Sequence, residues 1–200
     1  LAAAVMALGI SSSMIAMPAM CARKAAATVN SVLVMDLYEF GCQRRSMTAP
    51  PRVWRALFKP MYRDYCQIAH ARSKFAFMHS DGCITEIVDD LVEVGVDALN
   101  SQLFTMDLAD LARRAKGQLT FWGEIDRQHV MPAADPQVAR DAVRKVAQHL
   151  YDPQGGVIAQ FELGPGSRPE NAVAIFEEWE QVQREASCPN QRSLARRVGL

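Results

Sequence analysis

His79 and Asp81 could act together on a metal ion or on a proton, because they lie two residues apart at the end of an apolar run. The run is Phe75–Met78, and Ser80 and Gly82 complete the polar stretch that follows it. An apolar run of this length, bounded by turn residues, predicts a strand buried on both faces. In a regular strand, residues two apart point the same way, so the imidazole and the carboxylate would face one site. The alternative is a simple Asp-Gly turn that follows a histidine with structural contacts only.

Polar residues also follow the other apolar runs that we interpret as strands. These runs are Val32–Met35, Val96–Leu99, Leu119–Trp122 and Val157–Phe161. We expect catalytic roles for Asp36, Glu39, Glu124 and Asp126, and substrate binding by Gln43, Asn100, Gln102 and Trp122. Polar side chains at the carboxyl ends of parallel strands meet at one mouth, as α/β enzymes require. For Glu124 and Asp126, capping of a helix or loop is the open alternative.

Helical segments follow these strands, and together they predict the fold class. Apolar spacing, proline and glycine signals predict helices over residues 52–72, 84–94, 107–116, 136–151 and 169–184. We expect Pro60 to kink the first of them. Alternating strands and helices indicate a parallel sheet, either doubly wound or closed into a (β/α)8 barrel. No GxGxxG sequence follows a strand, which disfavours a dinucleotide fold. A barrel needs eight strands, so five strands predict an incomplete (β/α)8 barrel.

Composition limits the class of protein further. The chain has 200 residues, a formal net charge of zero and 50% hydrophobic residues, which suits one α/β domain. Because there is no basic excess, we expect no nucleic-acid partner. The five cysteines are odd in number and form no CxxC pair, which indicates a reducing, cytoplasmic location. The apolar opening is interrupted by serines and a proline, so we expect no membrane span.

Five short motifs, taken in order, resemble the uroporphyrinogen decarboxylase family. They are His79-Ser-Asp-Gly82, Gly95-Val-Asp-Ala-Leu-Asn100, Phe121-Trp-Gly-Glu-Ile-Asp126, Gly155-Gly156 and Pro169-Glu-Asn171. The resemblance covers about residues 30–182 and implies a (β/α)8 barrel of which this chain carries the last five βα units. We therefore expect an unassigned segment at 1–29, the barrel portion at 30–186 and a tail at 187–200. A truncated or frame-shifted gene product, or a fragment, would explain the missing strands.

The residues at the strand ends place the chain nearer to the methyltransferase branch of that family. Decarboxylases of the family end the last strand with Asn-Leu-Gly-His-Gly, whereas this chain reads Glu162-Leu-Gly-Pro165-Gly166. Methyltransferases of the family bind zinc through His-x-Cys and a later Cys. The corresponding positions here are His79, Asp81 and Glu162. A histidine and two carboxylates can hold Zn²⁺ and leave a position open.

Three functions follow from this resemblance. The first is metal-dependent methyl transfer with Zn²⁺ and a corrinoid carried by a partner protein. The second is decarboxylation of a porphyrinogen, with Asp36 near the pyrrole nitrogens. The third is no catalysis at all, because five strands leave two open edges. The expected partners are a small-molecule substrate, a corrinoid protein and a second copy of the chain in a homodimer.

Overall fold

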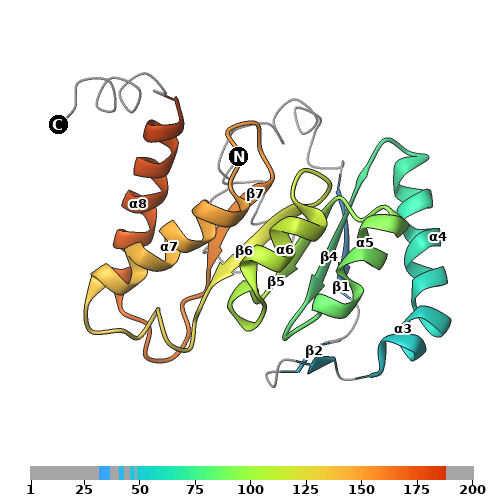
Figure 1. Ribbon diagram of the computed structural model, residues 1–200, viewed down its shortest axis with the longest axis horizontal. Coiled ribbons are helices and arrows are strands. Elements are labelled where there is room, and N and C mark those ends of the chain that lie inside the picture. The colour runs from blue at the N-terminus through green and yellow to red at the C-terminus, as the bar shows by residue number, and fades with distance from the viewer. Residues whose placement is uncertain (1–31, 37–40, 43–45, 48, 188–200) are drawn as a thin grey trace.

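The fold is a parallel sheet whose strands alternate with helices along the chain (Figure 1). This computed structural model describes residues 32–36, 41–42, 46–47 and 49–187. The strand order is β1-β4-β5-β6-β7, and every neighbouring pair is parallel. The strands are β1 (Val32–Asp36), β4 (Phe75–Ser80), β5 (Ala98–Ser101), β6 (Thr120–Ile125) and β7 (Val157–Phe161). Two short strands, β2 (Gly41–Cys42) and β3 (Ser46–Met47), form a separate antiparallel pair.

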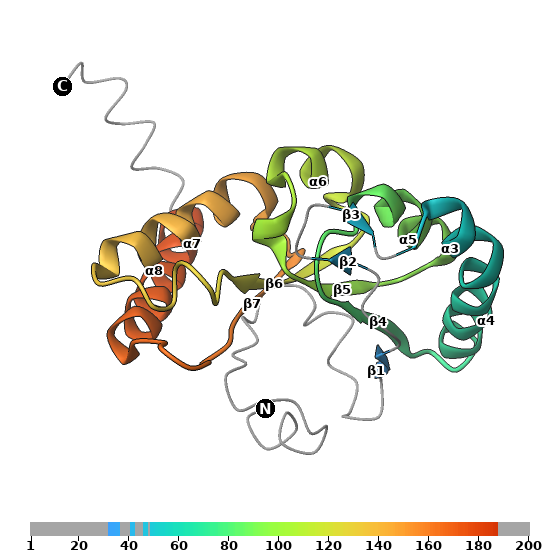
Figure 2. The ribbon, with the colours of Figure 1, turned by 90° about the horizontal axis from the view of Figure 1, so that it is seen from below.

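Helices lie along one side of this sheet, and no described helix covers its other side (Figure 2). They are α3 (Pro51–Leu57), α4 (Lys59–His70), α5 (Val88–Val94), α6 (Leu108–Ala115), α7 (Pro136–Leu150) and α8 (Pro169–Ser187). Two 3₁₀ turns, η2 (Thr85–Ile87) and η3 (Leu103–Thr105), precede α5 and α6. This arrangement confirms the predicted parallel α/β fold. Among the described residues, no helix is long and apolar enough to cross a lipid bilayer.

Local signals in the sequence explain where the helices begin and end. Asp107 and Asp135 cap α6 and α7, because their carboxylates accept hydrogen bonds from the backbone N–H of Asp110 and Gln137. Gly95 ends α5 in the left-handed conformation that glycine adopts without strain. Pro60 does not kink one long helix. The helix instead breaks at Phe58 into α3 and α4, and Pro60 lies in the first turn of α4, where a proline is tolerated.

The core lies between the sheet and the helices. Strand residues alternate, so Ala76, Met78 and Phe121 point into the core. Trp54 and Trp179, which helical spacing predicts to be core residues, are buried there. Phe75 and Phe77 point to the opposite, inner side of the sheet and are only half-buried. Polar side chains at the carboxyl ends of the strands also lie on this inner side, so the inner side carries the candidate site.

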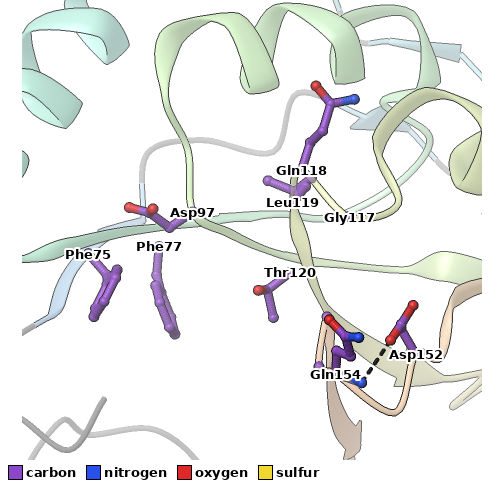
Figure 3. A pocket seen from close by; sticks show the side chains of 11 residues that line it. Phe75, Phe77, Asp97, Gly117, Gln118, Leu119, Thr120, Asp152 and Gln154 are labelled. Atoms are coloured by element: carbon purple, nitrogen blue, oxygen red, sulfur yellow. Dashed lines mark hydrogen bonds between the residues drawn. The ribbon is translucent and has the colours of Figure 1, made fainter. Parts of the chain in front are cut away.

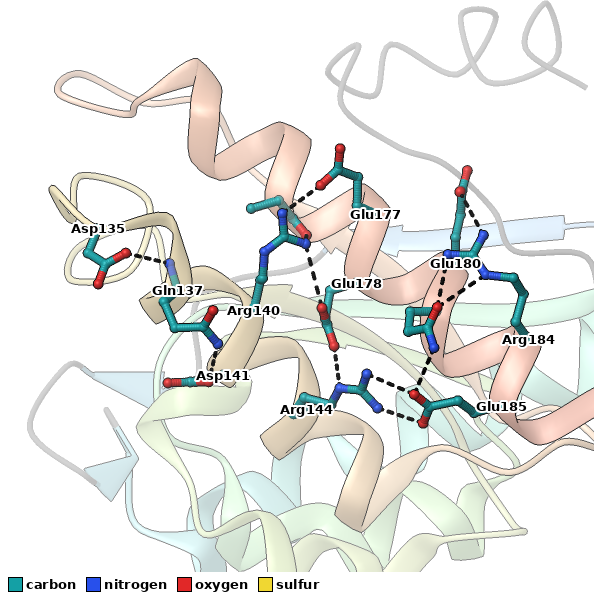
Figure 4. A network of polar contacts seen from close by, with 12 residues as sticks. Asp135, Gln137, Arg140, Asp141, Arg144, Glu177, Glu178, Glu180, Arg184 and Glu185 are labelled. Atoms are coloured by element: carbon teal, nitrogen blue, oxygen red, sulfur yellow. Dashed lines mark hydrogen bonds and ion pairs between the residues drawn. The ribbon is translucent and has the colours of Figure 1, made fainter. Parts of the chain in front are cut away.

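The last two helices are joined by an ion-pair network (Figure 4). Arg144 on α7 contacts both Glu178 and Glu185 on α8, and the pair with Glu185 uses two nitrogens at 2.8 and 3.1 Å. Arg140 contacts Glu177 at 2.5 Å one turn earlier. The network fixes α8 against α7, so that the end of β7, which precedes α8, is held in place.

Candidate functional site

The register of the strands brings the predicted site residues into adjacent rows on the inner side of the sheet. Asp36 is opposite His79, His79 is opposite Asn100, and Asn100 is opposite Trp122. In a parallel sheet, residues in register point to the same face. The side chain of Asp36 lies outside the described part of the chain, so its place is known from the backbone alone. Glu39 and Gln43 lie outside the described residues altogether.

Asn100 is the centre of a hydrogen-bond network that joins four strands, β4 to β7. Its amide nitrogen donates to the carbonyl oxygen of Trp122 at 2.9 Å and to the side-chain oxygen of Gln160. Since the carbonyl of Trp122 can only accept, the amide oxygen of Asn100 must face His79 and accept from its Nδ1–H. The second ring nitrogen, Nε2, lies 4.0 Å from a carboxylate oxygen of Asp81.

Arg127, just beyond the end of β6, contacts three carboxylates from three strand ends. It donates to Asp81 at 3.3 Å and to Glu162, and its Nε lies 3.5 Å from Oε1 of Glu124. Partial burial by itself lowers the pKa of Arg127, but the hydrogen bond to Glu162 and the neighbouring negative charges raise the pKa above its ordinary value. The guanidinium is therefore a permanent positive charge at the mouth of the sheet.

Glu124 is the most deeply placed of these acids, with 7% of its surface exposed. Its Oε1 has no hydrogen-bond partner among the described residues. Burial raises the pKa of Glu124 to about 7; Arg127 lowers it in part, whereas Glu162 and Asp81 add to the rise. A carboxyl group with this pKa exchanges a proton near neutral pH, which suits a general acid or base.

A cavity of about 200 Å³ opens beside Glu124. Gln102 lines it and accepts a hydrogen bond from the backbone N–H of Gly82 at 3.0 Å, which fixes the turn after β4. Phe104 supplies an aromatic wall. Asp126 also lines the cavity, but its carboxylate accepts from the backbone N–H groups of residues 128 and 129 and contacts the ring of His129. Asp126 therefore acts as a loop cap, the alternative that the sequence left open, and Glu124 does not.

A larger cavity, of about 360 Å³, lies at the other end of the strands (Figure 3). Phe75, Phe77 and Thr120 form its wall, and a turn at residues 152–156 closes one side. These are the amino-terminal ends of β4 and β6, whereas parallel α/β folds place their chemistry at the carboxyl ends. Trp122, between these two ends of β6, is buried, and its ring meets that of Phe77 edge to face with 5.7 Å between the ring centroids. We therefore treat the smaller cavity as the candidate active site.

The expected zinc ligands converge on one rim, but their arrangement does not fit a metal ion. His79 and Asp81 are close, whereas Asp81 and Glu162 are both taken up by Arg127. Throughout the described ranges, no three His, Cys, Asp or Glu side chains form a group that could hold a metal. Cys83, next to the motif, is buried against Thr85 at 3.6 Å from its hydroxyl. Zinc at this position stays a prediction.

Two residues that the structure brings into the candidate site, Arg127 and Gln160, were missing from the sequence-based set. Arg127 directly follows the Glu124-Ile-Asp126 motif, and a cation among acids at a strand end was the available signal. Gln160 lies in the apolar strand β7, and its position two residues before Glu162 would have placed it on the same face.

Comparisons with known proteins identify the fold and the family. The family model of uroporphyrinogen decarboxylase (URO-D) matches residues 20–182. A solved methyltransferase from Methanosarcina mazei has a similar fold, with a TM-score of 0.58 and 12% sequence identity. The similarity covers 76% of this chain and 42% of the methyltransferase, so this chain spans less than half of that protein's length. No curated protein matches the chain.

The order of the strands, the parallel register and the family match together confirm the expected partial (β/α)8 barrel. The chain belongs to the uroporphyrinogen decarboxylase family, and its five βα units make up part of that family's barrel.

Proposed function

We propose that this chain is part of a methyltransferase-type enzyme that takes a methyl group from a small thioether or methyl ether. The observation that carries the proposal is the buried Glu124 at the carboxyl end of β6, beside a cavity of about 200 Å³. A cavity of this size suits a small methylated substrate. A corrinoid on a partner protein would supply the methyl acceptor.

Glu124 serves in this reaction as the general acid. As the bond between the methyl group and the sulfur or oxygen breaks, the heteroatom keeps the electron pair. The leaving thiolate or alkoxide then takes the proton of Glu124, and Glu124 becomes a carboxylate. Arg127, 3.5 Å away, stabilises that new negative charge, because opposite charges attract strongly in a partly buried site.

The charges around Arg127 argue for methyl transfer over decarboxylation of a porphyrinogen. Two carboxylates, Asp81 and Glu162, and the acid Glu124 surround one guanidinium, so this cluster has no positive charge to spare for a substrate rich in carboxylates. The loop after β7 also carries Pro165 where the decarboxylases of the family have a histidine. We expect no coproporphyrinogen from uroporphyrinogen.

The test is methyl transfer by the full chain to free cob(I)alamin, followed by the change in visible absorption. Methylated thiols and methyl ethers serve as donors. We expect Glu124→Gln to lower the turnover rate by roughly 10²-fold or more, which is the usual contribution of a general acid.

Glu177→Gln is the matched control, because Glu177 lies on α8, where it contacts Arg140 and not the cavity. This variant should keep the parent's rate. The proposal is wrong if Glu124→Gln transfers methyl groups as fast as the parent, or if the chain produces coproporphyrinogen instead.

A further inference from the structure

One arginine satisfies carboxylates that come from three different strands. Nη2 of Arg127 donates to Asp81 after β4, Nη1 donates to Glu162 after β7, and Nε faces Glu124 on β6. Each guanidinium nitrogen therefore has its own acid. The planar guanidinium suits this role, since its five N–H groups are fixed in direction and its charge is not lost by titration.

The cluster is only partly open to solvent. The side chains of Asp81, Arg127 and Glu162 are 23%, 31% and 37% exposed, and Glu124 is almost wholly buried. Oε1 of Glu124 has no hydrogen-bond partner among the described residues, so an acceptor aimed at the cluster is left open. Acids this close together, one of them buried, need a positive charge close by.

That positive charge occupies the place where a metal ion would need to bind. A metal ligand must bring its oxygen to roughly 2.0–2.2 Å from the ion. Glu162 and Asp81 already accept from the two terminal nitrogens of the guanidinium, and His79 is hydrogen-bonded to Asn100. A divalent ion would have to displace the guanidinium from both acids and would be repelled by its charge.

We propose that the guanidinium of Arg127 is the resident cation of this rim and that it excludes a divalent metal ion from Asp81, Glu124 and Glu162. When Arg127 is removed, the three acids lose this positive charge, and a divalent ion is no longer repelled from them. The proposal rests on these contacts and is independent of the methyl-transfer reaction, because it concerns binding alone.

The experiment compares Mn²⁺ binding by the parent chain and by Arg127→Gln, using isothermal titration calorimetry on the full chain. Mn²⁺ is the probe because it prefers oxygen ligands, whereas Zn²⁺ would also bind the cysteines. We expect Arg127→Gln to bind one Mn²⁺ at least about tenfold more tightly than the parent, because three acids lose their counter-ion.

Three variants act as matched controls. Arg127→Lys keeps the positive charge and should bind Mn²⁺ as weakly as the parent. Adding Glu162→Gln to Arg127→Gln removes one of the three acids and should abolish the gain. Arg168→Gln, which alters an arginine that pairs with Glu170 outside the cluster, should change nothing.

Three results would overturn the proposal. The first is one equivalent of Mn²⁺ or Zn²⁺ bound by the parent and lost in His79→Ala. The second is equal binding by the parent and Arg127→Gln, and the third is no binding by either at millimolar concentration. If Arg127→Gln does not fold, NMR of the parent decides: Zn²⁺ must leave the Nε–H resonance of Arg127 unchanged, and a shift of that resonance contradicts the exclusion.

Discussion

Asn100 accepts a hydrogen bond from Nδ1 of His79, and this contact determines which nitrogen of the ring is free. The orientation of the Asn100 amide is fixed from the other side, where its nitrogen donates to the carbonyl of Trp122 and to Gln160. His79 is thereby held with a hydrogen on Nδ1, and its Nε2 lies 4.0 Å from a carboxylate oxygen of Asp81.

Replacing Asn100 with leucine should release His79 from that tautomer. The substitution leaves the Nδ1–H and the side-chain oxygen of Gln160 without a partner in a nearly closed environment, so we expect a loss of about 1–3 kcal/mol in the free energy of unfolding. Urea denaturation measures the loss, and nitrogen NMR of the ring measures the tautomer. Gln137→Leu, at an exposed amide on α7, should change stability by less than about 0.5 kcal/mol. An unchanged tautomer in Asn100→Leu would contradict the role given to this contact.

The raised pKa of Glu124 predicts how stability and activity depend on pH. Its pKa rises from 4.5 to about 7 on folding, mainly because of burial. Between these values the folded chain binds more protons than the unfolded chain, so the free energy of unfolding falls as pH rises from 4.5 to about 7. At about 1.4 kcal/mol per pH unit, the loss is roughly 3 kcal/mol.

Glu124→Gln should remove this part of the pH dependence. Chemical denaturation of both proteins between pH 5 and pH 8 measures the free energy of unfolding at each pH. The stability of the variant relative to the parent should be greater at pH 8 than at pH 5. Turnover of the parent should fall as pH rises through about 7, since the protonated form of Glu124 is the acid. Parallel stability curves for the two proteins would show that Glu124 titrates as an ordinary surface acid.

Gly123, in the middle of β6, is required by the close approach of Leu103 in η3. A Cβ at residue 123 would lie 2.1 Å from Cδ1 and 3.0 Å from Cγ of Leu103, which is fully buried. Gly123→Ala should therefore lower the free energy of unfolding by about 1–3 kcal/mol through overpacking. In a double-mutant cycle, Leu103→Ala should relieve most of that loss. Additive effects in the cycle would mean that the contact with Leu103 is not the cause.

Arg144 should contribute more to stability than the other arginines on the outer surface of the helices. It contacts Glu178, which is nearly buried, and it binds Glu185 through two nitrogens. Because Arg144 itself is partly exposed, solvent reduces the effect, and we expect Arg144→Gln to cost about 1–2 kcal/mol. Arg184→Gln, in an exposed pair with Glu180, should cost less than about 0.5 kcal/mol. Thermal denaturation of both variants at low and high salt measures the difference, and equal losses would refute it.

Most elements of the fold could be predicted from local signals. The apolar runs, the capping aspartates and the glycine after α5 place strands and helices within a few residues of where they lie. The run predicted at Val96–Leu99 shows the limit: the strand β5 is Ala98–Ser101, so Asn100 is part of the strand and not its tail. Pairing with β4 and β6 extends the strand beyond the apolar residues, and no local pattern contains that information.

The sequence by itself determined that acids, amides and one histidine gather at the carboxyl ends of parallel strands, because alternation along each strand is a local property. Only the tertiary structure decided what those residues do to one another. The space between Asp81 and Glu162 is filled by Arg127, and Asp126 turns back to cap its own loop. Such contacts depend on the distances between strands and on which acids compete for the guanidinium of Arg127. Neither can be predicted from local sequence patterns.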